Sequence, residues 1–535
     1  MITTTYFKKK YLFPIFLFII STVYMFFFTQ GVPFFWDDHQ FHEHFLSYSA
    51  SYWIKDIITQ TGTLSLYDHR GVYALFVNAL FYLFEYSFDY YRLIKAGVFG
   101  AYICSFYFIT YFMTKKESFS FLLSLLPLCS FPLYIHTLVF DEPFIIMELF
   151  KISAFLLFLR WYLEFPRRYS FLVLSVGCMF FASRTYITGY SAYATLFLFL
   201  FFQQLKRIKE HPKILTLTII VTLILGSIAG YFFIHAAPHG ISIFPFTHTF
   251  LNEWSNTISS PLITFDSLYY KSFSAMLTFF GFWILVVSSI ILSIHKRHTS
   301  KESTQTYPPH LTTYIIFIFC WIISELPLWI ALPEHAIRYT SGLVAPLTLL
   351  IGVLCIHTAS LLQNNYQKYY CLFLLTFFFC ICLTHITYSL AYRVGWGSSF
   401  IAMDSTADYL TKNAPHATVT YYGLSAAEDY LILTYELNNY TIQKDVLFVK
   451  NTDPSFYEHI LVTPEKEIYV LQRITPRGTE FPPMSEIQKE NLIYVNTISG
   501  LETDYFDKAY AFFFSLLHKN PLTTYVIIYR LSSQE

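Results

Sequence analysis

Charged residues are scarce in this sequence: they make up 13% of its 535 residues, whereas about 25% is usual for a soluble domain. Hydrophobic residues supply 55% of the chain and aromatic residues 21%. This composition predicts a membrane protein. The 35 basic residues equal the 35 acidic residues in number, so no net positive charge favours nucleic acid as a partner.

Paired cysteine spacings are also missing. All eight cysteines lie in apolar runs, and none belongs to a C-x-x-C pair of the kind that binds zinc. A disulfide framework and a zinc cage are therefore not expected. The sequence has no glycine-rich P-loop that would cradle a nucleotide phosphate, and it has no internal repeat.

Long apolar runs and clusters of Lys and Arg predict the membrane topology. Lys8, Lys9 and Lys10 precede the first apolar run, which places the N-terminus in the cytoplasm. Between successive cationic clusters the number of crossings must be even. Eleven crossing helices satisfy this rule: Tyr11–Thr29, Leu93–Met113, Phe119–Leu138, Pro143–Tyr162, two within Phe171–Phe202, Ile214–Ile234, Ser272–Ile294, Thr312–Ile330, Ser341–Leu362 and Tyr370–Leu390.

One further apolar run, Val72–Phe88, must not cross, because the number of crossings from Asp38 outside to Lys116 inside is odd. It is about 17 residues long, at the lower limit for a spanning helix, and it contains Asn78 and Glu85. A re-entrant or interfacial helix is predicted there. Before it, Phe41, Phe45, Tyr48 and Tyr52 recur at helical spacing, which is typical of a helix lying in the membrane surface.

The predicted fold is thus a polytopic α-helical membrane domain over residues 1–391, followed by a small extracytoplasmic α/β domain over 392–535. The second part contains short runs rich in β-branched and aromatic residues, which predict strands. They alternate with helical patterns at about 403–412, 425–437 and 504–517. The expected strands are Val419–Tyr422, Asp445–Val449, Ile468–Leu471 and Thr524–Ile528.

Asp37 and Asp38 follow directly after the first membrane helix. Adjacent carboxylates repel one another, so one of them can act as a general base while the other orients a substrate or binds a cation. Alternatively, Asp38 caps the helix that follows it. Asp38 and His42 also have the i, i+4 spacing of two metal ligands on a helix, so a divalent metal ion is one occupant that the pattern allows; contact of the histidines with headgroups or water is the other reading.

A second acidic group, Asp141 and Glu142, precedes Pro143 at the start of a later helix. Glu148 and Lys151 lie one and two turns further on, at i, i+3 spacing. At that depth both charges must face the protein interior, where they can pair. Asp141 can contribute to a site, or it can cap a helix that begins with proline while the Glu148–Lys151 pair is purely structural.

Arginine residues on the predicted outer side suit phosphate recognition, because a guanidinium group presents a planar fork of donors. They are Arg70, Arg184 and Arg338, the last within His335–Tyr339. Contact with lipid headgroups is the alternative role.

The order of these features resembles that of the GT-C glycosyltransferases, and among them it is most similar to the protein O-mannosyltransferases and the lipid A aminoarabinose transferases. The resemblance covers about residues 1–360. It rests on Trp36-Asp37-Asp38, Leu83–Ser87 with Tyr91–Leu93, Phe140-Asp141-Glu142-Pro143, Ala182-Ser183-Arg184, and His335–Tyr339 followed by Pro346.

The resemblance implies a multi-pass enzyme of the cell membrane, most similar to those of a bacterial inner membrane. It implies transfer of a sugar from a polyprenyl-phosphate donor to a cell-surface glycan, lipid or protein, with inversion at the anomeric carbon. Asp37 or Asp38 would be the base and Asp141 would position a substrate. Arg70, His335, Arg338 and Tyr339 would bind the donor phosphate. A transporter or flippase for lipid-linked glycans is the main alternative, because it would also place charges such as Glu148, Lys151 and Glu325 in helices. A glycan polymerase or ligase is another.

Overall fold

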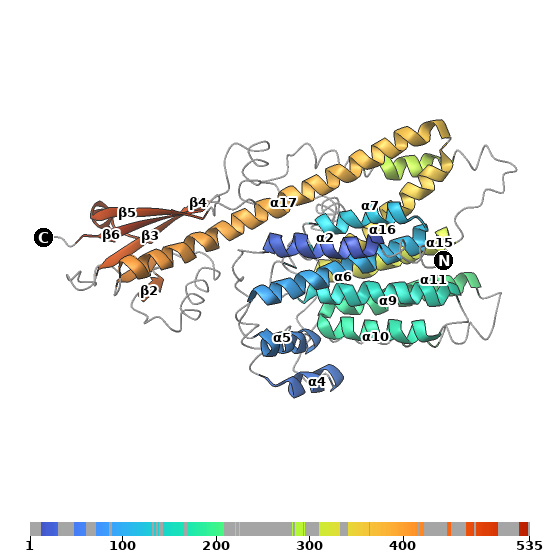
Figure 1. Ribbon diagram of the computed structural model, residues 1–535, viewed down its shortest axis with the longest axis horizontal. Helices are drawn as coiled ribbons and strands as arrows, with labels where there is room; N and C mark the ends of the chain where they lie inside the picture. Colours follow the sequence, from blue (N-terminus) through green and yellow to red (C-terminus); the bar gives the residue numbers. More distant parts are fainter. Residues whose placement is uncertain are drawn as a thin grey trace. The chain divides into compact units, whose positions relative to one another are not determined.

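The computed structural model describes part of the chain, and most of that part is helical (Figure 1). The described residues are 12–29, 48–59, 71–84, 88–130, 133–134, 137, 143–164, 169–207, 220, 224, 281, 284–292, 294, 310–331, 341–362, 364–414, 417–421, 447–450, 467–475, 478–500 and 524–532.

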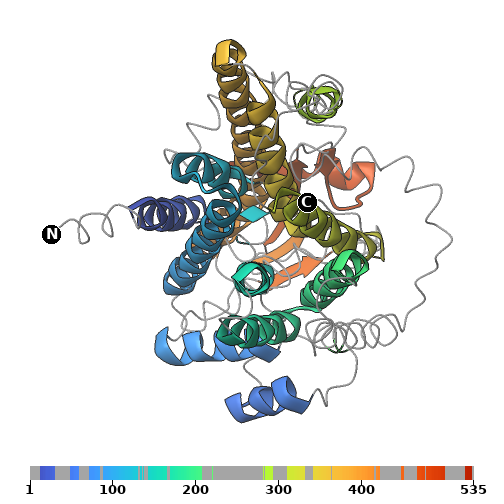
Figure 2. The ribbon, with the colours of Figure 1, turned by 90° about the vertical axis from the view of Figure 1, so that its right-hand side faces the viewer.

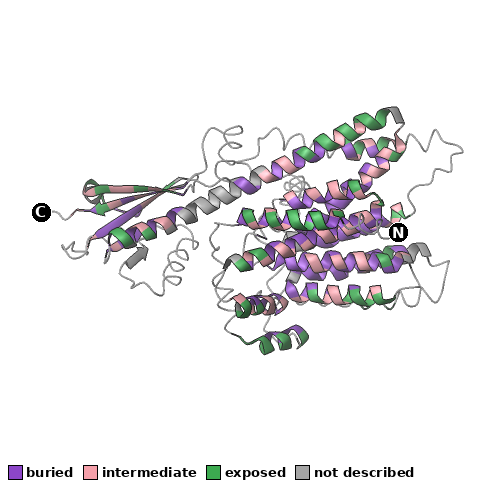
Figure 3. Ribbon diagram, in the orientation of Figure 1, coloured by how far each residue is buried: buried purple, intermediate pink, exposed green. Residues whose placement is uncertain are grey.

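Among these residues, four helical segments are long and apolar enough to cross a membrane: α2 (Leu12–Thr29), Tyr90–Thr114 within α6 (Phe88–Thr114), α16 (Ser341–Leu361), and Tyr366–Ile386 within α17 (Asn364–Asn413). Large apolar side chains of α2, such as Ile15 and Phe16, are exposed (Figure 3). A surface of this kind is stable against lipid tails and not against water. The protein is therefore a helical membrane protein with a small sheet, and the total of eleven crossings stays a prediction.

Helix α9 (Phe144–Glu164) lies in the interior of the membrane domain. It packs against α6 and α10 (Tyr169–Thr185), while α15 (Leu311–Ala331) packs against α11 (Ser191–Arg207) and α16 (Figures 1 and 2). Arg160 is the only exposed residue among those of α9 whose side chains are described. Most of this helix is therefore removed from solvent, including its charged residues Glu148 and Lys151.

Two predictions for the membrane domain have clear outcomes. The run Phe171–Phe202 does contain two helices, α10 and α11, joined by the short 3-10 helix η1 (Ile187–Tyr190). A Cβ atom on Gly189 would lie 2.2 Å from the carbonyl oxygen of Ala182, so only glycine permits this close turn. The expectation of an unbroken helix over Phe119–Leu138 is wrong.

The helix in that region, α7 (Glu117–Cys129), ends at Ser130, which has an extended backbone conformation with ψ of 120°. The sequence favours an end of the helix here: Pro132 lacks a backbone N–H, so it cannot donate the helical hydrogen bond to the carbonyl of Leu128. The structure describes little of two further predicted crossings. It describes only residues 220 and 224 of Ile214–Ile234, and only residues 281, 284–292 and 294 of Ser272–Ile294.

Between α2 and α6 the structure describes two short helices, α4 (Ala50–Thr59) and α5 (Gly71–Phe84), which pack against each other. The 14 residues of α5 rise by about 21 Å, which is less than the roughly 30 Å of a hydrocarbon core. The described helix is thus shorter than a hydrocarbon core, and the failure of Val72–Phe88 to cross stays a prediction. The residues before Tyr48 in the predicted surface helix lie outside the described residues.

The short α5 leads to a prediction about topology. A single accessible cysteine introduced at Asp89 should react with a membrane-impermeant reagent from outside the cell, and one at Lys116 should not, because α6 crosses between them. Labelling at Lys116 should appear only after the membrane is opened. A cysteine at position 89 that reacts only after the membrane is opened would be cytoplasmic and would refute the predicted role of α5.

Helix α17 is continuous for 50 residues, about 75 Å, which exceeds the thickness of a bilayer's hydrocarbon core more than twofold. Tyr370–Leu390 and the helical stretch at 403–412 were expected as separate elements, and they are parts of this one helix. The contacts divide the chain into two units, with a boundary in α17 between Ile386 and Thr387. The described residues of the second unit are those after Ile386 together with Phe28 and Thr29 at the end of α2.

This second unit contains a mixed sheet with strand order β2-β1-β3-β6-β5, in which β4 pairs with β3. Strand β1 is parallel to β2 and β3, whereas β6 is antiparallel to β3 and β5. All four predicted strands are present. The strands are β1 (Thr418–Tyr421), β2 (Leu447–Lys450), β3 (Ile468–Thr475), β4 (Gly478–Glu480), β5 (Leu492–Ser499) and β6 (Tyr525–Leu531), with the short helix α19 (Glu486–Glu490) before β5.

Strand β5 was not predicted, although its sequence LIYVNTIS is rich in β-branched and aromatic residues. The adjacent polar residues Asn496 and Thr497 interrupt the apolar pattern, and Asn496 lies at a register shift between β5 and β6. The predicted helices at 425–437 and 504–517 lie outside the described residues.

Candidate functional site

The predicted catalytic and phosphate-binding residues fall outside the part of the chain that the structure describes. They are Asp37, Asp38, Arg70, Asp141, His335, Arg338 and Tyr339, and the predicted metal partner His42 is outside it too. Within the described residues, no group of three or more His, Cys, Asp or Glu residues could hold a metal ion. The roles assigned to these residues therefore stay predictions.

The described residues contain a different polar site, deep in the helical domain. Glu148 and Lys151 lie on consecutive turns of α9, and their side chains are fully buried. Glu325, on α15, is the third member, with 6% of its side chain exposed. Lys151 forms ion pairs with both carboxylates, so a single ammonium group joins α9 to α15.

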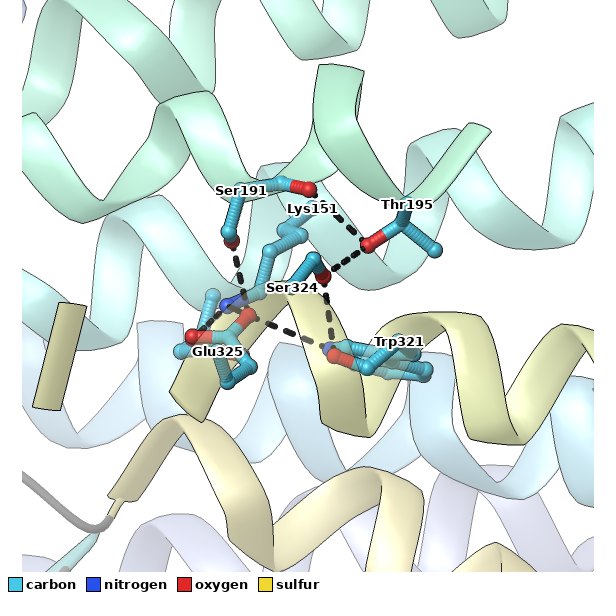
Figure 4. A network of polar contacts seen from close by, with 7 residues as sticks. Lys151, Ser191, Thr195, Trp321, Ser324 and Glu325 are labelled. Atoms are coloured by element: carbon cyan, nitrogen blue, oxygen red, sulfur yellow. Dashed lines mark hydrogen bonds and ion pairs between the residues drawn. The ribbon is translucent and has the colours of Figure 1, made fainter. Parts of the chain in front are cut away.

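Glu325 collects most of the hydrogen-bond donors (Figure 4). Its Oε1 atom accepts hydrogen bonds from Lys151 Nζ at 2.7 Å and from Ser191 Oγ at 2.7 Å. Trp321 Nε1, one turn earlier on α15, donates to the same oxygen at 3.3 Å. Donors to an ionised carboxylate form stronger hydrogen bonds than neutral pairs do, so Glu325 is stabilised as an anion.

A second layer of hydroxyl groups fixes the elements that carry these donors. Ser191 is the first residue of α11, and its backbone carbonyl accepts a hydrogen bond from Thr195 Oγ1 at 2.8 Å. The hydroxyls of Thr195 and Ser324 lie 2.5 Å apart, and Ser324 Oγ donates to the carbonyl of Trp321 at 2.8 Å. These contacts tie α11 to α15 beside Glu325 (Figure 4).

Helix α16 closes the site from another side. A Cβ atom on Gly342 would lie 2.6 Å from Glu325 Oε2 and 3.8 Å from Glu148 Oε1. Even a methyl group would therefore overlap the Glu325 carboxylate. Glycine at this position lets the α16 backbone pack directly against the two carboxylates and excludes water from them.

Glu148 is less well satisfied than Glu325. Apart from its ion pair with Lys151, neither of its oxygens has a hydrogen-bond partner among the described residues. Tyr102, from α6, is a further titratable group that interacts with Glu148, and its hydroxyl also lacks a hydrogen-bond partner there. Side chains of α6, α9, α11 and α15 therefore interact in this site, where two carboxylates share one cation.

The sequence predicted the Glu148–Lys151 pair, and the structure confirms it. The sequence also indicated Glu325 as a charge within a helix, but it did not predict that Glu325 joins the pair. The sequence held one indication of this contact. Glu325 is a carboxylate in an apolar helix, so it needs a cationic partner, and Lys151 is a cation in another apolar helix.

Arg184 lies in the last turn of α10. The sequence predicted this place, near the turn between two helices. Its guanidinium carbon lies 5.4 Å from the ring centroid of Phe180, which is a cation–π contact. Thr185, Tyr186 and η1 follow before α11 begins. The described contacts do not place Arg184 with the buried cluster.

Comparisons with protein-family models, with curated proteins and with solved structures found no match for this chain.

Proposed function

We propose that this protein is an integral membrane glycosyltransferase that transfers a hexosyl or pentosyl group from a polyprenyl-phosphate donor to an extracytoplasmic acceptor. The observation that supports this most is the pair of short helices α4 and α5, which follow the Asp37–Asp38 doublet and precede α6. On this proposal the doublet and the two helices lie at the same boundary of the membrane.

The exposed side chains of these helices suit a membrane surface. In α4, Trp53 and Ile57 are buried, whereas Ile54 and Ile58 are exposed, the latter by 70%. In α5, Tyr82 and Leu83 are exposed. Apolar groups on a short helix are stabilised when they enter the boundary between headgroups and acyl chains. A lipid-linked sugar has its tail in the bilayer and its anomeric carbon near this depth.

On this proposal one carboxylate of the Asp37–Asp38 pair removes the proton from an acceptor hydroxyl. The acceptor oxygen then forms a bond to the anomeric carbon while the bond from that carbon to the phosphate oxygen breaks. The electron pair leaves with polyprenyl phosphate, and the configuration inverts. Arg338, with Arg70, His335 and Tyr339, offsets the phosphate charge, and Asp141 positions the sugar or acceptor.

The experiment uses the purified full-length chain and a panel of radiolabelled polyprenyl-phosphate sugars, with a membrane extract as the source of acceptors. We expect at least one sugar to move from the lipid to an acceptor, with release of an equal amount of polyprenyl phosphate. Failure to transfer any sugar of the panel in the presence of a complete extract would contradict the proposal.

Arg338 provides a sharper test of phosphate recognition. Arg338→Lys keeps the charge and loses the planar fork of donors, so transfer should fall by at least about 10-fold, and Arg338→Ala should reduce it further. Initial rates and donor affinity measured on both variants would show this order. An arginine that only contacts lipid headgroups tolerates lysine, so an unchanged rate and affinity for Arg338→Lys would rule out its role in phosphate binding.

A carrier for lipid-linked glycans is the second candidate, and the buried cluster of Glu148, Lys151 and Glu325 favours it, because charges inside membrane domains often mark transport pathways. Vesicles containing the purified chain distinguish the two. A carrier moves a fluorescent lipid-linked glycan across the bilayer unchanged, whereas the proposed transferase cleaves the bond between sugar and phosphate.

A further inference from the structure

The buried cluster carries an excess of negative charge when all its members are ionised. Glu148 and Glu325 contribute two negative charges, and Lys151 contributes one positive charge. The side chains of Glu148 and Lys151 are 0% exposed, so water cannot screen this imbalance. A net charge without solvent or a counter-ion is strongly unfavourable in a membrane domain, so the cluster formed by these described residues needs one more positive charge.

The packing restricts what can bring that charge. The α16 backbone at Gly342 is so close to the carboxylates that an added methyl group would lie 2.6 Å from Glu325 Oε2. Lys151 Nζ already occupies the space between the two acids. A metal cation or an ammonium ligand would have to displace these groups. A proton needs no additional volume.

The donors decide which carboxyl group takes the proton. Three donors from three side chains converge on Glu325 Oε1 and favour its anion: Lys151, Ser191 and Trp321. Glu148 receives only Lys151 and has no other hydrogen-bond partner among the described residues. The groups that act on Glu148 are Lys151 on its own helix, Glu325 on α15 and the Tyr102 hydroxyl on α6.

We propose that Glu148 is a proton-binding site within the membrane domain. In the folded protein it is a neutral carboxyl group whose carbonyl oxygen accepts a hydrogen bond from Lys151, and the single ion pair of the cluster is Lys151–Glu325. Loss of the proton would place a second anion against the α16 backbone. The protonation of Glu148 therefore controls the charge at the contact between α9, α11, α15 and α16.

Infrared spectroscopy of the purified full chain tests this proposal directly, because only a protonated carboxyl group gives the C=O stretching band of a carboxylic acid. The sample is kept in a detergent without ester groups, at a pH at which exposed carboxylates are ionised. We expect the band in the parent protein and its loss in Glu148→Gln. Glu325→Gln should remove the band too, because Glu148 then becomes the single counter-ion of Lys151 and ionises. Glu486→Gln, which removes a carboxylate whose side chain is 85% exposed, is the control and should leave the band unchanged.

Stability gives a second readout that does not depend on the band. Glutamine has the shape and neutrality of a protonated glutamate, so Glu148→Gln should keep the parent Tm, whereas Glu325→Gln should lower it. A parent protein without the band would overturn the proposal. So would a band that Glu325→Gln removes and Glu148→Gln keeps, or a Glu148→Gln variant that fails to fold, since the cluster would then require the anion at position 148.

Discussion

Replacing the catalytic member of the Asp37–Asp38 pair with asparagine should slow sugar transfer by about 10²- to 10⁴-fold, the usual effect of removing a general base. The amide keeps the size of the carboxyl group but cannot accept the proton of the acceptor hydroxyl. Initial rates at saturating donor, measured for Asp37→Asn and Asp38→Asn separately, would identify which residue acts. Donor affinity should change little, because the proton is transferred only in the transition state.

Asparagine also separates catalysis from helix capping. It caps a helix about as well as aspartate, so both variants should be nearly silent if the pair only begins the following helix. Asp408→Asn, an exposed carboxylate on α17, is a matched control for loss of one acidic charge and should keep the parent rate. Parent turnover in both single variants at positions 37 and 38 would rule out a catalytic base in this pair.

Lys151→Met should destabilise the helical domain by about 3–5 kcal/mol, the usual cost of removing one partner from a buried ion pair. Methionine fills much of the volume of the lysine stem, so packing changes little. The Glu325 carboxylate then stays buried with Ser191 and Trp321 as donors but without a cation. Unfolding in a denaturing detergent, followed through the helical signal, measures the difference.

The design has two controls. Lys489→Met removes the cation of Glu486–Lys489, another i, i+3 pair, with 44% of Lys489 and 85% of Glu486 exposed; solvent screening limits its expected cost to about 0–1 kcal/mol. The double variant Lys151→Met with Glu325→Gln removes both charges and should recover a large part of the loss. If Lys151→Met costs no more than Lys489→Met, the buried cluster contributes little to stability.

Four strands of the second unit were predictable because short strands depend on local sequence. The runs at β1, β2, β3 and β6 combine β-branched and aromatic residues and are separated by polar segments. Their order in the sheet was not predictable, since β6, the last strand in the chain, pairs with β3 and β5. Such pairing depends on which surfaces bury each other and not on sequence distance.

Helix boundaries in the membrane domain were also predictable only in part. The break between α10 and α11 was expected within a run too long for one helix, and it occurs where Gly189 meets Ala182. The break at Ser130 was missed, because apolar composition alone continues through Phe131 and Pro132. Hydrophobicity measures the preference for lipid, whereas proline and glycine decide the backbone conformation.

The sequence by itself determined that this is a helical membrane protein with a small α/β part, because scarcity of charge and long apolar runs act locally and add along the chain. It also placed Glu148 and Lys151 on one helix face, since i, i+3 spacing fixes that. Only the tertiary structure decided that Glu325, 174 residues from Lys151, would share the same ammonium group. It also decided that Ser191 would donate to Glu325 and that Gly342 would close the site. The physical reason is that a buried charge is stabilised by whichever groups the packed helices bring within a few ångströms, and that proximity is set by the fold as a whole.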